Sequence, residues 1–228
     1  MEIIDVEEGL GMIVMQYSGD IKEFSPSKKK SLIENFIEIK EELISKFNIS
    51  FQIFNSKYII SEDQIKLILH QVYSSFLQKT NISKQYSIEF LLYLSQERQI
   101  TKAIEKVGIK IPNDKTNTSF GEILFGDPVN LRKALDFLEN KINLSNHHQF
   151  KYLGPNKWIF FMETYNISID QIINILKANN YKQNIEIRSL NDLQNNISPD
   201  LIRKALTDAF ITGMVKLYIE NFKRNMEN

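Results

Sequence analysis

The stretch SFGEILFGDPVNLRKALDFL, residues 119–138, joins a strand signal to a helix signal and indicates the fold class. Its first part, residues 119–127, is short and mostly apolar, which is typical of a buried strand. Asp127 then precedes Pro128, and an aspartate cap followed by proline in the first helical turn is a common helix start. The stretch therefore predicts a strand that passes directly into a helix.

The same order of strand and helix recurs earlier in the chain. Residues 11–17 and 51–60 have the β-branched and aromatic composition of strands. Residues 25–47 and 61–76 carry apolar side chains at helical spacing, which predicts two amphipathic helices. This alternation predicts an α/β fold in a single domain over residues 1–228, with a small mixed β-sheet packed against several helices.

Helix starts are marked by Ser25 with Pro26 and by Ser61 with Gln64, the second pair forming a capping-box pattern. The second half of the chain has weaker patterns. These predict possible strands at 151–153 and 157–162, a helix at 170–179, a strand at 185–190 and a long helix from Ser198 to about Phe222.

The composition favours a folded cytoplasmic protein. Of 228 residues, 43% are hydrophobic, and 28 basic residues balance 28 acidic ones, so no net charge attracts nucleic acid or membrane. The chain has no cysteine, no basic and apolar leader, and no apolar run of about 18 residues, so we expect no membrane span.

Sequence motifs for catalysis are absent. The three histidines, His70, His147 and His148, have no motif partner, and no phosphate loop, zinc motif or nucleophile elbow occurs. We therefore expect a binding protein that is not an enzyme and needs no cofactor or metal.

A polar interruption stands out in FLLYLSQERQITKAIEKVGIK, residues 90–110. Ile100, Ala103, Ile104 and Val107 predict one buried helix face, and Lys102 and Lys106 lie opposite it, roughly in line with Arg98. The helix start would offer free N–H groups near Arg98 and Gln99, which together suit a phosphate.

Lys79, Asn81 and Lys84, in the preceding loop, could extend this patch. The alternative interpretation is a solvated basic face whose local counter-charges are Glu97 and Glu105.

The C-terminal helix has more apolar residues than one core face explains. With Ile202, Ala205, Leu206 and Ala209 turned inward, a second stripe remains, and we expect it to contact a partner. Its members are Phe210, Gly213, Met214, Leu217 and Tyr218. The alternative is that residues 22–50 or 145–185 cover this stripe.

Residues 81–109 resemble the signature of the CGI-type subunit of the KEOPS (EKC) complex, the small kinase-binding subunit of archaea and eukaryotes. The matching residues are Glu89, Leu91, Tyr93, Ser95, Arg98, Gln99, Ile100, Ala103, Ile104 and Gly108. Gln96 departs from the archaeal pattern, which usually has glycine there. Segments 22–50 and 145–185 have no counterpart in the pattern, which makes them candidate insertions.

The resemblance implies a non-catalytic subunit that binds the atypical kinase/ATPase subunit directly and the transferase subunit indirectly, through the kinase. It also implies capture of tRNA by its 3′ CCA end, for threonylcarbamoylation of the adenosine next to the anticodon. Ser95 joins the expected RNA-binding residues on this basis. The competing interpretations are a kinase-regulating module without RNA contact and an unrecognised small-molecule enzyme.

Overall fold

The computed structural model describes residues 4–7, 9–20, 32–109, 117–141, 147–148, 157–179 and 189–227. The chain divides into two compact units. Residues Met1–Ser56 and Val72–Lys151 form the first, here called the sheet unit, and Lys57–Gln71 with Tyr152–Asn228 form the second, the helical unit. That residues 1–228 behave as one domain remains a prediction.

The sheet unit contains an antiparallel sheet. Its described strands are β1 (Ile4–Glu7), β2 (Leu10–Asp20), β3 (Ser50–Phe54), β4 (Asn117–Gly126) and β5 (His147–His148). They are ordered β1-β2-β4-β3, and β5 pairs with β2.

The α/β class is confirmed, but the expected mixed pairing differs from what the described strands form. Strands β2 and β3 do run in the same direction, yet β4 lies between them and is antiparallel to both. The strand–helix–strand unit is therefore split by a third strand, and no parallel pair results among the described strands.

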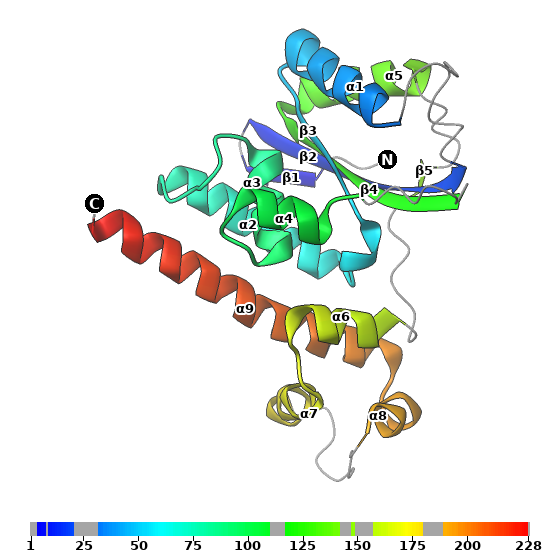
Figure 1. The fold of residues 1–228 in the computed structure, drawn as a ribbon, viewed down its shortest axis with the longest axis vertical. Helices are drawn as coiled ribbons and strands as arrows, with labels where there is room; N and C mark the ends of the chain where they lie inside the picture. The colour runs from blue at the N-terminus through cyan, green and yellow to red at the C-terminus, as the bar shows by residue number, and fades with distance from the viewer. Residues whose placement is uncertain are drawn as a thin grey trace. The chain divides into compact units, whose positions relative to one another are not determined.

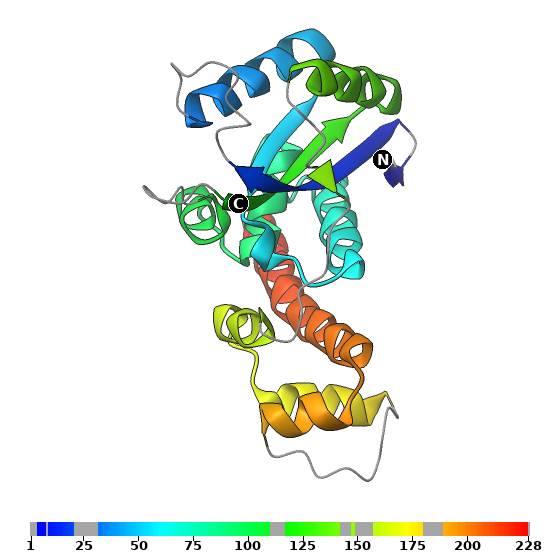
Figure 2. The same ribbon diagram turned by 90° about the vertical axis from the view of Figure 1, so that its right-hand side faces the viewer.

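Helices cover both faces of this sheet (Figure 1). Helices α1 (Leu32–Phe47) and α5 (Pro128–Lys141) lie on one face, as Figure 2 shows from the side. Helix α3 (Tyr86–Ser95) packs on the other face, and α4 (Ile100–Val107) packs against α3. The two-residue period of β4 turns Phe120 and Leu124 into the core beneath α1 and α5.

The predicted start of α5 is confirmed, because the Asp127 carboxylate accepts hydrogen bonds from the N–H groups of Val129 (3.0 Å) and Asn130 (3.1 Å). The predicted strand 51–60 is too long. The N–H of Asn55 donates to the carbonyl of Val107 (2.8 Å), so the chain leaves the sheet there and forms a 3-10 turn, Ser56–Tyr58.

Helix α2 (Glu62–Leu77) follows, and its residues are shared between the two units. The N–H of Gln64 donates to Ser61 Oγ (3.0 Å), which confirms Ser61 as the cap. The Gln64 side chain accepts from Ile60 rather than from Ser61, so only half of the capping box forms.

The helical unit also contains α6 (Trp158–Tyr165), α7 (Ile169–Ala178), α8 (Leu190–Asn196) and α9 (Pro199–Glu227). Helices α6 and α7 pack against α9. The predicted strand 157–162 is wrong, because its apolar run buries Trp158, Phe161 and Tyr165 at helical spacing. The predictions for residues 22–31, 151–153 and 185–188 lie outside the described residues.

Candidate functional site

Helix α3 is the buried axis of the predicted RNA site. The residues from Glu89 to Ser95 are all buried, as is Ser87. The helix begins at Tyr86 with Gln85 as its cap. The hydroxyl of Ser50, at the start of β3, donates to Ser87 Oγ (2.7 Å). One polar segment precedes this buried helix and another follows it.

The loop before α3 is held by the buried carboxylate of Glu89. This carboxylate accepts hydrogen bonds from the N–H groups of Ser83 (2.8 Å) and Ile82 (3.1 Å). Burial raises the pKa of Glu89, and these two backbone bonds lower it in part. Sequence reasoning missed this role, although an acid inside the apolar run SIEFLLYLS was the available signal.

Three predicted RNA-binding residues lie in that loop. Lys79 and Lys84 are exposed, and Lys79 adopts a positive φ of 58°. The side-chain amide of Asn81 donates to the carbonyl of Ser83 (2.9 Å), so it helps to shape the loop. Glu89 therefore positions these side chains without reaching the surface itself.

The turn after α3 is a Schellman motif. The N–H of Gln96 donates to the carbonyl of Tyr93 (3.2 Å), and that of Glu97 donates to Leu92 (3.1 Å). Ser95 is fully buried and its hydroxyl donates to the Leu92 carbonyl (3.0 Å). The side chain is therefore used inside the turn, and its contact with RNA stays a prediction.

Arg98 and Gln99 lie between this turn and α4, as predicted. Gln99 is the exposed cap of α4, and its side chain makes no capping hydrogen bond. The N–H groups of the first turn are thus not occupied by a cap. Arg98 is half-buried, with its Nε atom inside the protein. The inner end of the guanidinium is therefore buried beside a helix start.

The faces of α4 differ in part from the prediction. Ala103 and Val107 are buried, whereas Ile100 and Ile104 are 40% and 47% exposed, because the short helix packs only a narrow stripe on α3. Lys102 is exposed. Lys106 is 3.5 Å from the Glu97 carboxylate, so part of its charge is already balanced.

The structure divides the predicted RNA residues between the two ends of α3. Ten helical residues span about 15 Å, which separates the loop of Lys79, Asn81 and Lys84 from the α4 start with Arg98, Gln99 and Lys102. They do not form one phosphate site. A single strand of RNA could follow both groups, since such sites commonly extend over several nucleotides.

A pocket of ≈410 Å³ lies at the α3 start, at one end of the sheet. Its apolar wall consists of Leu10, Ile44, Ile49, Tyr86 and Phe125. Its polar rim includes Asn48, Ser50, Lys84, Gln85 and Asp127. Residues from α1, β3, α3 and β4 thus meet around one opening.

In the helical unit, the predicted partner stripe of α9 is partly internal. Phe210 and Met214 are buried, and Gly213 is half-buried. The Phe210 ring lies 4.8 Å from that of Tyr165 and 6.0 Å from that of Phe161, so α6 covers it. The alternative that residues 145–185 cover this stripe is confirmed for Phe210.

Other apolar side chains of α9 are exposed. Val215 is 37% exposed and Ile219 is 46% exposed, and their spacing of four residues puts them on one face. The side chains of Leu217 and Tyr218 lie outside the described part of the structure, so their role as partner contacts stays a prediction.

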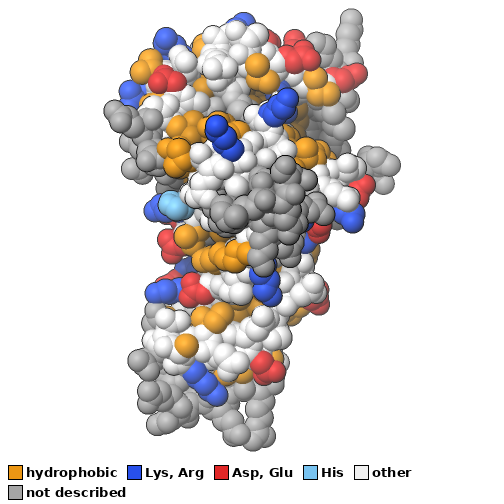
Figure 3. All heavy atoms as spheres, turned by 90° about the vertical axis from the view of Figure 1, so that its left-hand side faces the viewer, with side chains coloured by type: hydrophobic (Ala, Val, Ile, Leu, Met, Phe, Trp, Pro, Cys, Tyr) orange, Lys and Arg blue, Asp and Glu red, His pale blue; other side chains and the backbone are white. Residues whose placement is uncertain are grey.

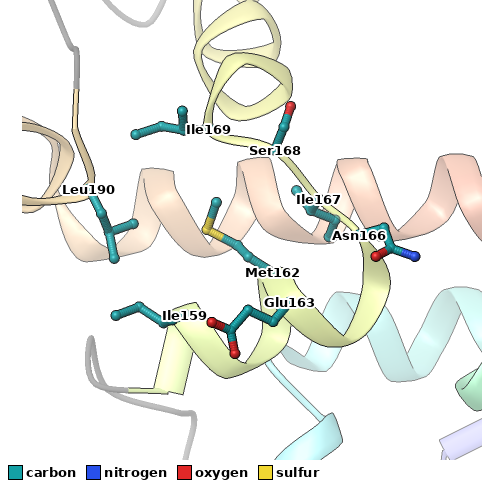
Figure 4. Close-up of a pocket in the computed structure, with 8 residues that line it drawn as sticks. All are labelled: Ile159, Met162, Glu163, Asn166, Ile167, Ser168, Ile169 and Leu190. Carbon is teal, nitrogen blue, oxygen red and sulfur yellow. The ribbon is translucent and has the colours of Figure 1, made fainter.

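A second surface of the helical unit is an apolar groove of ≈570 Å³. Figure 4 shows Ile159, Met162, Ile169 and Leu190 around it, with the carboxylate of Glu163 at its edge. The turn from α6 to α7 forms one wall, where Asn166 takes a positive φ of 51°. Such a groove suits a protein contact better than polar chemistry.

The family comparison adds to this geometry. A sequence model of the family described as "Kinase binding protein CGI-121" matches residues 31–193, well over half of the chain. The chain belongs to the CGI-121 family of kinase-binding proteins. A search of curated proteins finds no match to it.

The surface of this CGI-121 family member agrees with its balanced charge. On the face shown in Figure 3, Lys and Arg side chains are interspersed with Asp and Glu rather than gathered in one field. Among the described residues there is no group of His, Asp and Glu that could hold a metal ion. No described helix is long and apolar enough to cross a membrane.

The departure from the family pattern at Gln96 has a measurable cost. Its φ of 56° confirms that this position needs the left-handed region, which glycine adopts without strain. We expect Gln96→Gly to raise the free energy of unfolding by about 0.5–1 kcal/mol in urea titrations. Asn166→Gly, at the equivalent turn of α6, is the control and should gain less, because asparagine tolerates this conformation better. No gain for Gln96→Gly would contradict the expectation.

Glu122 is a buried acid on β4, on the face beneath α1 and α5 and between Phe120 and Leu124. Burial raises its pKa from 4.5 to about 8. The unfolded chain therefore releases this proton at lower pH than the folded chain does. The contribution of Glu122 to stability is greatest below pH 4.5, falls as the pH rises to about 8, and is constant above.

Glu122→Gln should remove this dependence, because glutamine carries no charge at any pH. Between pH 4.5 and about 8, the free energy of unfolding of the wild type should fall by up to about 1.4 kcal/mol per pH unit relative to that of Glu122→Gln. Urea titrations at pH 5.5 and 7.5 test this, with the exposed Glu139→Gln as control. Equal changes in wild type and Glu122→Gln would refute the assignment.

Proposed function

We propose that this kinase-binding protein is a non-catalytic adaptor of the KEOPS complex that also captures tRNA. In this proposal it acts in the cytoplasm, binds the atypical kinase/ATPase subunit directly, and reaches the transferase subunit through that kinase. The tRNA is held, by its 3′ CCA end among other contacts, for threonylcarbamoylation of the adenosine next to the anticodon.

The observation that carries the RNA part is the position of Arg98. Its guanidinium is partly buried beside the start of α4, where the cap side chain leaves the first N–H groups without a side-chain cap. A partly buried guanidinium and an uncapped helix start together favour a phosphate. Lys102 and Gln99 are exposed next to it and can add a second charge and an amide.

The kinase part is supported by the family and by the exposed face of α9. Val215 and Ile219 form an apolar stripe that a partner could cover. Gly213, Leu217 and Tyr218, which the sequence assigned to the partner surface, are close to them in the chain. The groove beside Glu163 is the other surface that a kinase could occupy.

Electrophoretic mobility shift with intact tRNA and with tRNA that lacks its CCA end tests the RNA part. We expect a shift with intact tRNA and a weaker one without CCA. Co-purification with the kinase subunit of the same organism tests the other part. Kinase binding without any tRNA shift would favour the second candidate function, a kinase-regulating module without RNA contact, for which the balanced net charge is the supporting observation.

A further inference from the structure

The pocket at the start of α3 has the size of a ligand site. Its volume of ≈410 Å³ falls within the range of about 300–1,000 Å³ that is usual for small-molecule pockets. Because its walls come from α1, β3, α3 and β4, its shape depends on the packed sheet unit rather than on one loop.

Its apolar wall suits a flat ring. The Tyr86 ring stacks on Phe76 with centroids 3.9 Å apart and lies 5.9 Å from the Phe125 ring. These neighbours fix its orientation, and part of the residue stays accessible. A fixed, partly exposed aromatic ring stabilises planar ligands by stacking and apolar contact.

Its rim suits an anion at one side only. Lys84 is exposed and has no acidic partner among the described residues, while the neighbouring Ser83 is held by Glu89. Asp127 is the pocket's other charged residue, and its carboxylate is engaged by two N–H groups of α5. Charge therefore directs an anionic group toward Lys84 and away from Asp127.

The side chain of Asn48 can form hydrogen bonds with the edge of a planar ligand. The exposed side-chain amide of Asn48 lines the rim and makes no hydrogen bond to another described residue. An amide can donate and accept at once, as the edge of a nucleobase requires. A fatty-acid chain would use neither this amide nor the aromatic wall in this way.

We propose that this pocket binds a nucleotide, with the base against Tyr86 and the phosphate at Lys84. The source of the nucleotide rests on the proposed function: a captured RNA strand that passes Arg98 would place one of its nucleotides here. A free nucleotide has the same chemistry and is the other source.

The test is a titration with AMP, followed by amide chemical shifts and calorimetry. Ile44→Phe fills the pocket from an exposed position on α1, and its control Ile37→Phe adds the same ring on the same helix outside the pocket. We expect Ile44→Phe to weaken AMP binding more than about tenfold and Ile37→Phe less than about twofold. Lys84→Ala should weaken AMP about tenfold but leave adenosine unchanged, because adenosine has no phosphate.

No AMP binding, or AMP affinity unchanged by Ile44→Phe, would overturn the proposal. A second arm uses single-stranded hexa-adenylate. Weaker hexa-adenylate binding by both Ile44→Phe and Arg98→Glu identifies the RNA strand as the source. Weaker AMP binding with unchanged hexa-adenylate binding identifies a free nucleotide. Because Arg98 lies at the other end of α3, AMP binding should survive Arg98→Glu, so failure of tRNA capture and failure of this pocket are separable.

Discussion

Arg98→Glu is expected to abolish tRNA binding while leaving kinase association intact. The substitution replaces a partly buried cation at the start of α4 by an anion, so a phosphate at this place would meet repulsion instead of two hydrogen bonds. We expect a loss of about two orders of magnitude or more, since charged hydrogen bonds contribute about 1.5–3 kcal/mol and the reversal adds repulsion. Mobility shift at two salt concentrations measures it.

Two further variants provide a comparison for the effect of Arg98→Glu on tRNA binding. Lys102→Glu, on the exposed face of α4, should weaken binding less, and its effect should shrink with added salt as phosphate contacts are screened. Lys133→Glu removes an exposed lysine from α5, on the opposite face of the sheet, and should have little effect. If Arg98→Glu and Lys102→Glu both bind tRNA as the parent does, the RNA site lies elsewhere.

Ile219→Glu is expected to break kinase association without unfolding the protein. Ile219 is 46% exposed on α9, so a charge there stays hydrated in the free protein but would be buried in the complex. A central interface position of this kind costs about 2 kcal/mol or more of binding, which is roughly thirtyfold or more in affinity. Pull-down with the kinase, beside the thermal midpoint of each variant, tests it.

Control variants distinguish the loss of a surface contact from the loss of core packing. Ile37→Glu changes an exposed isoleucine of α1 and should leave pull-down unchanged. Phe210→Glu should lower the thermal midpoint sharply, because Phe210 is packed against Tyr165. Leu217→Glu, suggested by the sequence, belongs in the same series. Loss of pull-down with Ile159→Glu alone would move the interface to the groove beside Glu163 and contradict the α9 assignment.

The elements predicted correctly are those with local signals. Asp127 and Pro128 mark the start of α5, and Ser61 marks the start of α2. Caps and turns are made by residues close in sequence, so their chemistry can be predicted without knowledge of the rest of the fold.

The errors concern features that depend on distant residues. Ile100 and Ile104 have the spacing of a buried face, yet how wide a stripe α4 buries depends on the surface of α3. The insertion of β4 between β2 and β3 makes the pairing of these strands antiparallel, and no local sequence pattern indicates it. Separation of Lys84 from Arg98 likewise follows from the straight helix between them.

The place of β4 between β2 and β3 also constrains the order of folding during synthesis. Ser50 pairs with Phe125, and Gly11 pairs with Gly126, so the inner sheet joins residues that are far apart in the chain. Until residues 117–126 leave the ribosome, β3 has no partner strand among the described ones, and its sequence SFQIF stays open to other chains. Contacts of such long separation slow folding. The nascent first half of this protein is therefore a natural client for chaperones, and a fragment that stops at residue 116 should aggregate rather than fold.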